Sequence, residues 1–424
     1  MICKSSLTLY VKYNEIKNIN YLTGDGEMAV IKRRVGLIVV AGLLAADNSY
    51  AQSSVTLYGV MDEGIDWTSN VKTATGSGQN QLGMASNILQ PSRWGLRGRE
   101  DLGGGLAAVF VLENGFDPST GQFGQGGLEF GRQAYVGLSG GYGTVTLGRQ
   151  YDSVVDYVGP FVAGTQWGGI TAAHGGDIDN LVNSWRVNNA VKYASPEMHG
   201  LKVGALYSLG GVAGDITRSQ IWSVGTSYHT GPASFGAAYL NVRQPNISFF
   251  GNSTSGTPST VTDNSASPIF SGFLSAHSYQ TFAAGGAYNI DRLTVGGTYS
   301  HIRFSGLGDL SAGPDPQGFQ GSVAFNNVEV NAKYQITPAL LVGVAYDYLM
   351  QGKAAPSNGA IYRTVSAGLD YFLSKATDVY FLAAMQHATG EASTGGGARA
   401  DLTTLGASSG ANQTLVRVGI RHKF

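Results

Sequence analysis

The chain has 424 residues, of which 62 are Gly, 22 are Tyr and one is Cys. Charged residues make up 13%, about half of the roughly 25% typical of soluble domains, and the net charge at pH 7 is -1. A single cysteine excludes an intramolecular disulfide scaffold, 43% hydrophobic residues argue against a disordered chain, and the near-zero charge argues against nucleic-acid binding. What remains is a large β-type chain rich in glycine and tyrosine.

A short apolar run spans residues 35–46 and follows three basic residues at 32–34. The run is shorter than the roughly 20 residues that a helix needs to cross a bilayer. Small residues after the run, ending at Ala51, form an A-x-A-like cleavage pattern. The segment therefore predicts a secretory signal peptide over residues 28–51.

The residues ahead of this signal do not fit an export signal. Signals begin with their charged region, which here starts shortly after Met28. We therefore expect Met28 to be the initiator, residues 1–27 to be a mis-called N-terminal extension, and residues 52–424 to be the mature chain. The lone Cys3 lies in the extension, so the exported chain has no cysteine.

From residue 52 onward no stretch of about 18 apolar residues predicts a transmembrane helix. Apolar and polar residues instead alternate over segments of about 8–12 residues, as in 324–335, 340–349 and 413–424. Alternation alone also fits a soluble sandwich with one wet face. Connections that alternate between tight turns and long polar loops, aromatic residues near the ends of the apolar faces, and the export signal favour an outer-membrane barrel.

The predicted fold class is all-β, a 16-stranded antiparallel transmembrane β-barrel. Backbone donors in hydrocarbon must be paired, so the sheet has to close, and sixteen strands leave an aqueous lumen. The lumen-facing positions are expected to be polar and charged. The expected strands are 55–66, 91–100, 106–114, 131–138, 144–150, 187–195, 201–209, 220–229, 233–242, 278–289, 292–303, 324–335, 340–349, 362–373, 379–388 and 413–424.

Two motifs match patterns of other protein classes. Residues 137–141 match the G-x-S-x-G elbow of hydrolases, but that elbow requires a following helix and a strand is predicted here. His174, Asp177 and Asp179 could offer ligands to a cation, but a solvated loop is the simpler interpretation and no H-E-x-x-H occurs. We predict no enzymatic activity, no metal site and no cofactor.

Six short motifs, in order along the chain, resemble the trimeric Gram-negative outer-membrane porins, especially those of β-proteobacteria. The resemblance covers nearly all of residues 52–424 and implies a channel for passive diffusion of small hydrophilic solutes and ions. It also implies that the long third loop folds into the pore. The motifs are SVTLYG (54–59), SRWGLRG with EDLG (92–98, 100–103), RQAYVGL (132–138), GRQY (148–151), LSK with TD (373–375, 377–378) and RHKF (421–424).

The resemblance further implies the partners of the chain: outer-membrane lipid and lipopolysaccharide, the outer-membrane barrel assembly machinery, and two further copies in a homotrimer. Phe424 closes a last strand of the kind the assembly machinery recognises, although a Phe that only anchors the aromatic girdle is compatible. Alternation places Arg149 outward, where lipid is a poor neighbour, and we expect it to form a trimer contact. Small or apolar outward residues offer a packing wall for that trimer: Leu57, Gly59, Met61, Ala108 and Phe110.

In such porins the third loop, here 151–186, faces a ladder of wall arginines. Arg93, Arg132 and Arg186 match those positions and by alternation face inward, whereas neighbours such as Tyr135 are placed on the outer apolar face. Glu113 is the wall carboxylate expected to compensate them. The remaining apolar-face neighbours are Trp94, Leu96, Val191 and Tyr193.

Many members carry a Glu at the tip of this loop, and the nearest match here is Gln166. Asp152 and Asp156 lie earlier in the loop and are expected to supply the negative side of the constriction instead. By alternation eleven basic residues and five acids face the lumen, which predicts weak anion selectivity, although such charges also serve simply to keep a lumen wet. The bases are Arg93, Arg97, Arg99, Arg132, Arg186, Lys192, Lys202, Lys333, Arg417, Arg421 and Lys423, and the acids are Asp62, Glu113, Glu329, Asp347 and Asp370.

Two other functions remain open at this point. A lipase or protease barrel needs a Ser/His or carboxylate constellation, which cannot be assembled from these residues. A substrate-specific or mainly structural or adhesive barrel is harder to exclude, because an open and a plugged barrel can share the same strand pattern.

Overall fold

The computed structural model of the chain describes residues 54–252 and 267–424. The expected extension over 1–27, with Cys3, and the expected signal peptide over 28–51 lie outside the described residues. No helix within the described ranges is both long enough and apolar enough to cross a membrane.

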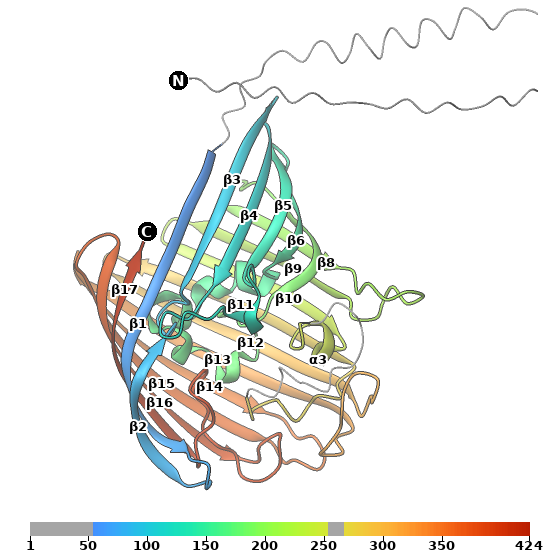
Figure 1. The fold of residues 1–424 in the computed structure, drawn as a ribbon, viewed down its shortest axis with the longest axis vertical. Coiled ribbons are helices and arrows are strands. Elements are labelled where there is room, and N and C mark those ends of the chain that lie inside the picture. The colour runs from blue at the N-terminus through green and yellow to red at the C-terminus, as the bar shows by residue number, and fades with distance from the viewer. Residues whose placement is uncertain (1–53, 253–266) are drawn as a thin grey trace, which may run out of the picture. The chain divides into compact units, whose positions relative to one another are not determined.

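The described chain forms one antiparallel sheet in which each strand pairs with its neighbours around a ring (Figure 1). The last strand pairs back onto the first, with Val60 opposite Lys423 and Thr68 opposite Leu415, so the sheet is a closed barrel. The strands are β1 (Ser54–Lys72), β2 (Gly78–Ser86), β3 (Arg93–Gly103), β4 (Leu106–Gly115), β5 (Gln133–Gly140), β6 (Gly143–Gln150), β7 (Val187–Ala194), β8 (Leu201–Ser208), β9 (Ile221–Thr230), β10 (Ala233–Arg243), β11 (Ser278–Ile290), β12 (Leu293–Leu307), β13 (Gly321–Thr337), β14 (Leu340–Gln351), β15 (Ala360–Phe372), β16 (Thr377–Gly390) and β17 (Asn412–Lys423).

Two of these strands are halves of a single barrel strand. The first half of β1 pairs with β3 and its second half pairs with β2, on the same side of β1. The prediction of sixteen strands in a closed antiparallel barrel is therefore confirmed. The half at β2 was not predicted, because its sequence GQNQLGMAS contains few of the β-branched and aromatic residues that favour strands.

The two faces of each strand alternate as the sequence predicts. In the pair β13–β14, Glu329 lies opposite Asp347, and both side chains are buried inside the barrel. The neighbouring positions Val330 and Val344 face outward and are 56% and 59% exposed, which is the apolar band that lipid requires.

Part of the barrel interior is apolar, contrary to the expectation of a polar lumen. Phe304 of β12 and Phe325 of β13 are fully buried on the inner face. They pack against Phe270 and Phe273 of the connection between β10 and β11, whose ring centroids lie 5.6–6.3 Å from Phe304 or Phe325. Inner-face positions covered by an inward-folded connection do not meet water, so they can be apolar.

The inward or outward direction of Tyr135 also differs from the prediction. Gln133 pairs with Glu113 and Tyr135 with Val111, so Tyr135 shares the inner face with Glu113. The strand begins only at Gln133, and Arg132 reaches inward from the irregular chain before it. Counting alternation through Arg132 therefore assigns Tyr135 to the wrong face.

The connection between β6 and β7, residues 151–186, is here called the constriction loop. It consists of short helical turns: α2 (Ser153–Tyr157), η2 (Gly159–Phe161), η3 (Gly164–Gly168), η4 (Ile170–Ala172) and η5 (Gly175–Asp177). α2 packs against the inner faces of β9 and β10, and in Figure 1 the turns of this loop are seen between front and back strands. The loop therefore lies inside the barrel.

Glycines on the inner wall allow two aromatic side chains of the constriction loop to lie flat against the barrel. A Cβ atom on Gly343 would lie 2.2 Å from the Trp167 ring, and Gly343 pairs with Gly368, which faces the same ring. A Cβ atom on Gly225 of β9 would lie 2.4 Å from the Tyr157 ring. Part of the high glycine content thus serves to seat this loop.

We expect Gly343→Val to unseat the constriction loop, because the added side chain would occupy the position of the Trp167 ring. Overpacking of this kind costs about 1–3 kcal/mol. The measurement is single-channel current in a planar bilayer, where the variant should be noisier than the wild type. Gly83→Val is the matched control, since a Cβ atom there meets nothing within 4 Å. A variant with the steady current of the wild type would contradict this account.

Candidate functional site: the pore constriction

Two of the three predicted arginines contact one carboxylate of the barrel wall, and the third lies beside them. Arg132 Nε donates to Glu113 Oε1 at 2.7 Å, and Arg93 Nε lies 3.7 Å from Glu113 Oε2. Arg186, at the end of the constriction loop, completes the group through Tyr151, whose ring centroid lies 5.8 Å from its guanidinium carbon. The structure thus places Arg93, Arg132, Arg186 and Glu113 together.

Two tyrosines that the sequence analysis missed bind the same carboxylate. Tyr58 donates to Glu113 Oε2 at 2.9 Å, and Tyr151 donates to Glu113 Oε1 at 3.0 Å. Arg132 Nη2 in turn donates to the Tyr151 hydroxyl at 3.0 Å. The sequence contained a usable signal, because both tyrosines lie in the motifs SVTLYG and GRQY that carry the family resemblance.

Arg186 remains charged although its side chain is almost fully buried. Its burial, together with the positive charge of Arg132, lowers the pKa of Arg186 to about 9. A group with that pKa is still protonated at neutral pH. The constriction therefore keeps three guanidinium cations around a single carboxylate.

The acids of the constriction loop do not oppose these cations as predicted. Asp152 is fully buried and caps α2, accepting from the backbone N–H groups of Val154 and Val155, and Asn180 Nδ2 donates to it at 2.7 Å. Burial raises the pKa of Asp152 to about 6. Its carboxylate therefore stabilises the loop itself and does not face the opening.

Asp156 and Gln166 take separate positions. Asp156 forms an ion pair with Lys192 of β7, which neutralises it locally. Gln166, in η3, lines the opening and donates to the Phe161 carbonyl oxygen at 3.0 Å. The loop thus presents a neutral amide to the opening.

Across the opening from the constriction loop, the break between β2 and β3 folds into the lumen. This inner segment, residues 87–92, is held by Asp62 Oδ2, which accepts from the backbone N–H groups of Leu89 and Gln90 at 2.7 and 2.9 Å. The Ile88 carbonyl oxygen accepts from the Ile170 N–H of the constriction loop at 2.8 Å. The inner segment and the constriction loop are therefore joined to each other beside the opening.

Arg417 is one of the predicted lumen cations, but it is paired with buried groups of the barrel wall beneath the inner segment. Arg417 Nη1 lies 2.7 Å from Asp66 Oδ1, and its Nε donates to the Tyr380 hydroxyl at 2.7 Å. Tyr380 in turn donates to Asp62. Since Arg417 is fully buried, it does not face the passage.

The opening is a cavity of about 690 Å³. It is lined on one side by the constriction loop, including Gln166, and on the other by the inner segment and strands β3, β13–β15 and β17. Among its lining residues five are basic and only Asp370 is acidic. The five basic residues are Arg93, Arg132, Lys333, Arg421 and Lys423.

A buried polar cluster anchors the constriction loop to the far wall. His174 Nδ1 lies 2.6 Å from Asp179 Oδ2 within the loop, and its Nε2 lies 3.3 Å from Glu329 and 3.8 Å from Asp347 on strands β13 and β14. Ser300 of β12 donates to Asp179 at 2.5 Å. The predicted solvated loop is thus wrong for His174 and Asp179, which are buried.

His174 carries a charge in this cluster. Burial by itself lowers the pKa of His174, but the carboxylates of Asp179 and Asp347 outweigh burial and raise the pKa well above its ordinary value. The imidazolium form of His174 is therefore favoured at neutral pH, beside the side chains of Asp179, Glu329 and Asp347. The structure gives no group of His, Cys, Asp and Glu in the described ranges that could hold a metal ion.

Arg149 and Phe424 lie outside the constriction. Arg149 Nε donates to the Gly131 carbonyl oxygen at 2.8 Å, and its Nη1 donates to Asn188 and Asn252 at 2.5 Å each. The partners expected from a second subunit are thus supplied by the same chain. The Phe424 ring lies over Gly59, whose Cβ atom would be 2.3 Å from it, and the two residues exchange backbone hydrogen bonds.

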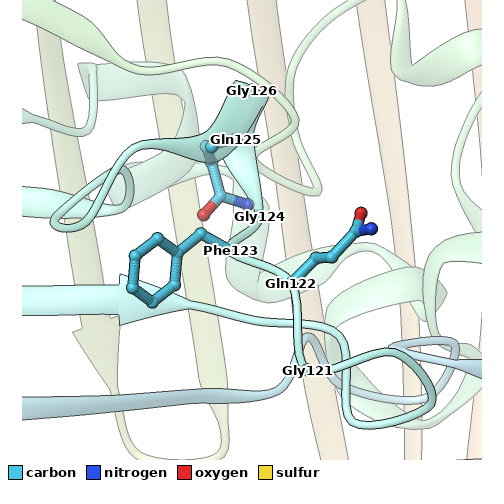
Figure 2. Close-up of a pocket in the computed structure, with 7 residues that line it drawn as sticks. Gly121, Gln122, Phe123, Gly124, Gln125 and Gly126 are labelled. Carbon is cyan, nitrogen blue, oxygen red and sulfur yellow. The ribbon is translucent and has the colours of Figure 1, made fainter.

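Two further features lie apart from the constriction. Ser139 of the G-x-S-x-G match lies in β5, and β6 follows after a tight turn, so no helix supports a nucleophile there. A hollow of about 670 Å³ lies in the loop between β4 and β5 and is lined by residues 121–127 alone. Figure 2 shows Phe123 and Gln122 pointing to opposite sides of this loop, whose curl creates the hollow.

Comparisons with known proteins agree with this geometry. The family model described as Gram-negative porin matches residues 36–418. Outer membrane porin protein 32 of Delftia acidovorans is 29% identical over 404 residues, covering 92% of this chain and 99% of that protein. An outer membrane porin protein of Bordetella pertussis is 39% identical over 186 residues, which span 40% of this chain and 47% of that protein. The solved anion-selective porin from Comamonas acidovorans superposes with a TM-score of 0.64 at 23% identity, covering 88% of this chain and all of that one.

We expect His174→Asn to loosen the anchor of the constriction loop. Breaking a buried ion pair leaves uncompensated carboxylates and costs about 3–5 kcal/mol. Because the folded pKa of His174 is raised, its stabilisation is complete below the ordinary pKa of about 6.5 and is lost as the pH rises through the folded value. The unfolding temperature of the wild type should therefore fall towards that of the variant in alkaline buffer.

The measurement is thermal unfolding in detergent, followed by circular dichroism from pH 6 upward. His199→Asn is the matched control, since His199 is exposed in the turn before β8 and its positive φ of 52° suits Asn. Equal unfolding temperatures for wild type and His174→Asn at pH 6 would show that the cluster does not hold the loop.

Proposed function

The chain belongs to the Gram-negative porin family, and on this premise we propose that the diffusion channel it forms in the outer membrane passes small anions more readily than cations. The observation that carries the proposal is the charge of the constriction cavity, with five basic residues and one acid in its lining. Charges of one sign along a narrow passage raise the local concentration of the opposite ion.

The net charge at the constriction stays positive when the acids behind the cavity lining are included. Six cations lie there against three carboxylates, which pair with Arg93, Arg132 and Arg421. Lys333 and Lys423 form no ion pair within the described residues, so their charges act on the passage directly. The cations are Arg93, Arg132, Arg186, Lys333, Arg421 and Lys423, and the carboxylates are Glu113, Asp370 and Asp378.

The constriction loop adds no free negative charge to offset these cations. Asp152 is buried as a helix cap, Asp156 is paired with Lys192, and Gln166 is neutral. These placements support the anion preference that the lumen charges predict. A substrate-specific channel, or a structural or adhesive barrel, remains the alternative.

We also propose that the chain assembles as a homotrimer, in outer-membrane lipid and lipopolysaccharide, through the barrel assembly machinery with Phe424 as its signal. The outward side chains of Leu57 and Met61 on β1 are 58% and 44% exposed, which leaves an apolar wall for a neighbouring subunit. Arg149 lies at the end of β6, where its guanidinium donates to groups of its own chain. The trimer contact expected of Arg149 itself stays a prediction.

For ion preference, the zero-current potential across a KCl gradient should have the sign of chloride permeation. It should be largest in dilute salt, because the screening length is about 10 Å at 0.1 M and shrinks to about 3 Å at 1 M. Lys333→Gln should lower the chloride-to-potassium permeability ratio about twofold, since it removes one unpaired charge from the cavity.

Lys375→Gln is the control for that charge removal, because Lys375 is exposed in the short turn between β15 and β16, away from the cavity. A cation-selective wild type would overturn the proposal. A barrel without conductance steps would favour the structural or adhesive alternative.

For the oligomer, native mass measurement in mild detergent should give three chains per particle. Leu57→Gln should dissociate this particle, whereas Val344→Gln, which changes an equally exposed side chain on β14, should not. A wild-type monomer would contradict the trimer, and equal behaviour of the two variants would move the contact elsewhere on the barrel.

A further inference from the structure

A second cavity, of about 500 Å³, lies on the long-loop side of the constriction. It is enclosed by the loop between β4 and β5, the end of β6, the end of the constriction loop and the segment that follows α3 (Pro245–Ser248). Its lining contains two arginines, Arg149 and Arg186, and three aromatic rings, those of Trp185, Phe249 and Phe250. None of its lining residues within the described ranges is acidic.

Neither arginine of this cavity is neutralised by a carboxylate of the described residues. Arg149 donates there to the carbonyl oxygen of Gly131 and to the side-chain amide oxygens of Asn188 and Asn252. Arg186 is 5% exposed, donates from Nη1 to the Ser184 carbonyl oxygen, and has a buried Nε without a partner among the described residues. Buried positive charge without a counterion is costly, so a bound anion would stabilise this arrangement.

The opposite side of the cavity is a fixed aromatic surface. The Trp185 ring centroid lies 6.0 Å from that of Phe249 and 4.8 Å from that of Phe250, the latter in an edge-to-face arrangement. Phe249 and Phe250 are 1% exposed and Phe250 packs in turn against Phe270, so the surface is held in place before any ligand arrives. Aromatic ligands gain most from such preorganised edge-to-face and offset contacts.

We propose that this cavity is a binding site for small aromatic carboxylates of the benzoate class. A planar carboxylate accepts hydrogen bonds from guanidinium groups, and a single ring fits against the partly exposed Trp185, which Phe249 and Phe250 hold from behind. The combination of one negative group and one ring matches the two chemical features that the lining presents. An inorganic anion would use the arginines alone, and an uncharged aromatic compound would use the rings alone.

The site connects with the constriction through Tyr151. The Tyr151 ring lies under Arg186, and its hydroxyl accepts from Arg132, which lines the constriction cavity. In this inference a carboxylate held at Arg186 is delivered to the constriction cavity, whose lining includes Arg132 and Arg93. The inference rests on the proposed passage of anions, because it makes the second cavity a loading site for that passage.

The experiment measures how aromatic carboxylates block chloride current through the purified full chain in a planar bilayer. Benzoate, acetate and benzyl alcohol are added separately to the side that carries the long loops. Benzoate should reach half-block at a concentration at least about tenfold lower than acetate or benzyl alcohol, since only benzoate offers both the charge and the ring. Equal half-blocking concentrations for benzoate and acetate would overturn the proposal.

Two variants test the two halves of the site. Arg149→Gln should raise the half-blocking concentration of benzoate about fivefold, the order expected for losing one charge-assisted hydrogen bond. Trp185→Leu should remove the preference of benzoate over acetate. The control is Arg363→Gln, because Arg363 lies over the Tyr348 ring at 5.6 Å, much as Arg186 lies over Tyr151, but outside this cavity.

The outcomes separate this inference from the proposed anion preference. A chloride-selective channel in which benzoate blocks no better than acetate, or in which Arg149→Gln behaves like Arg363→Gln, would refute the site and leave the anion preference standing. A channel without chloride preference that is still blocked by benzoate in an Arg149-dependent manner would support the site and refute the loading role.

Discussion

In a membrane, each backbone donor and acceptor that meets hydrocarbon has to find its partner within the protein. That constraint closes the sheet, with β17 paired to β1, and closure creates an enclosed lumen. Within the lumen, water and inward-folded chain can satisfy polar groups, and irregular backbone is therefore tolerated there. The constriction loop and the inner segment 87–92 are both irregular, and both lie on this side of the wall.

The arrangement of charge follows from the same enclosure. Cations near low-dielectric walls are costly unless shared carboxylates and hydroxyl groups hold them. Glu113 serves two guanidinium groups with the help of Tyr58 and Tyr151, and Asp370 and Asp378 serve Arg421 in the same way. The acids of the constriction loop are engaged in contacts that cap its helix and anchor it to the wall. A positive excess is therefore left at the opening, where ions pass.

The sequence predicted the strands well because the side-chain period of a strand matches the apolar-polar alternation imposed by lipid on one face and the lumen on the other. It missed β2, where the alternation covers only Leu82 and Met84. It placed Tyr135 on the wrong face because the strand starts after Arg132. It also expected a polar lumen throughout, since alternation cannot reveal that an inward-folded connection covers Phe304 and Phe325.

For the site, the sequence by itself determined which residues could serve: the arginines at 93 and 132 lie in two of the family motifs, Arg186 ends the third loop, and Glu113 lies in an expected strand. Only the tertiary structure decided which of the acids meets them. The sequence offered Glu113 on the wall and Asp152 in the loop as acids near the arginines, but Asp152 caps α2 and Glu113 binds the arginines. Such pairings join residues that are far apart along the chain. They depend on how the closed wall and the folded loop meet in space, which local sequence patterns do not predict.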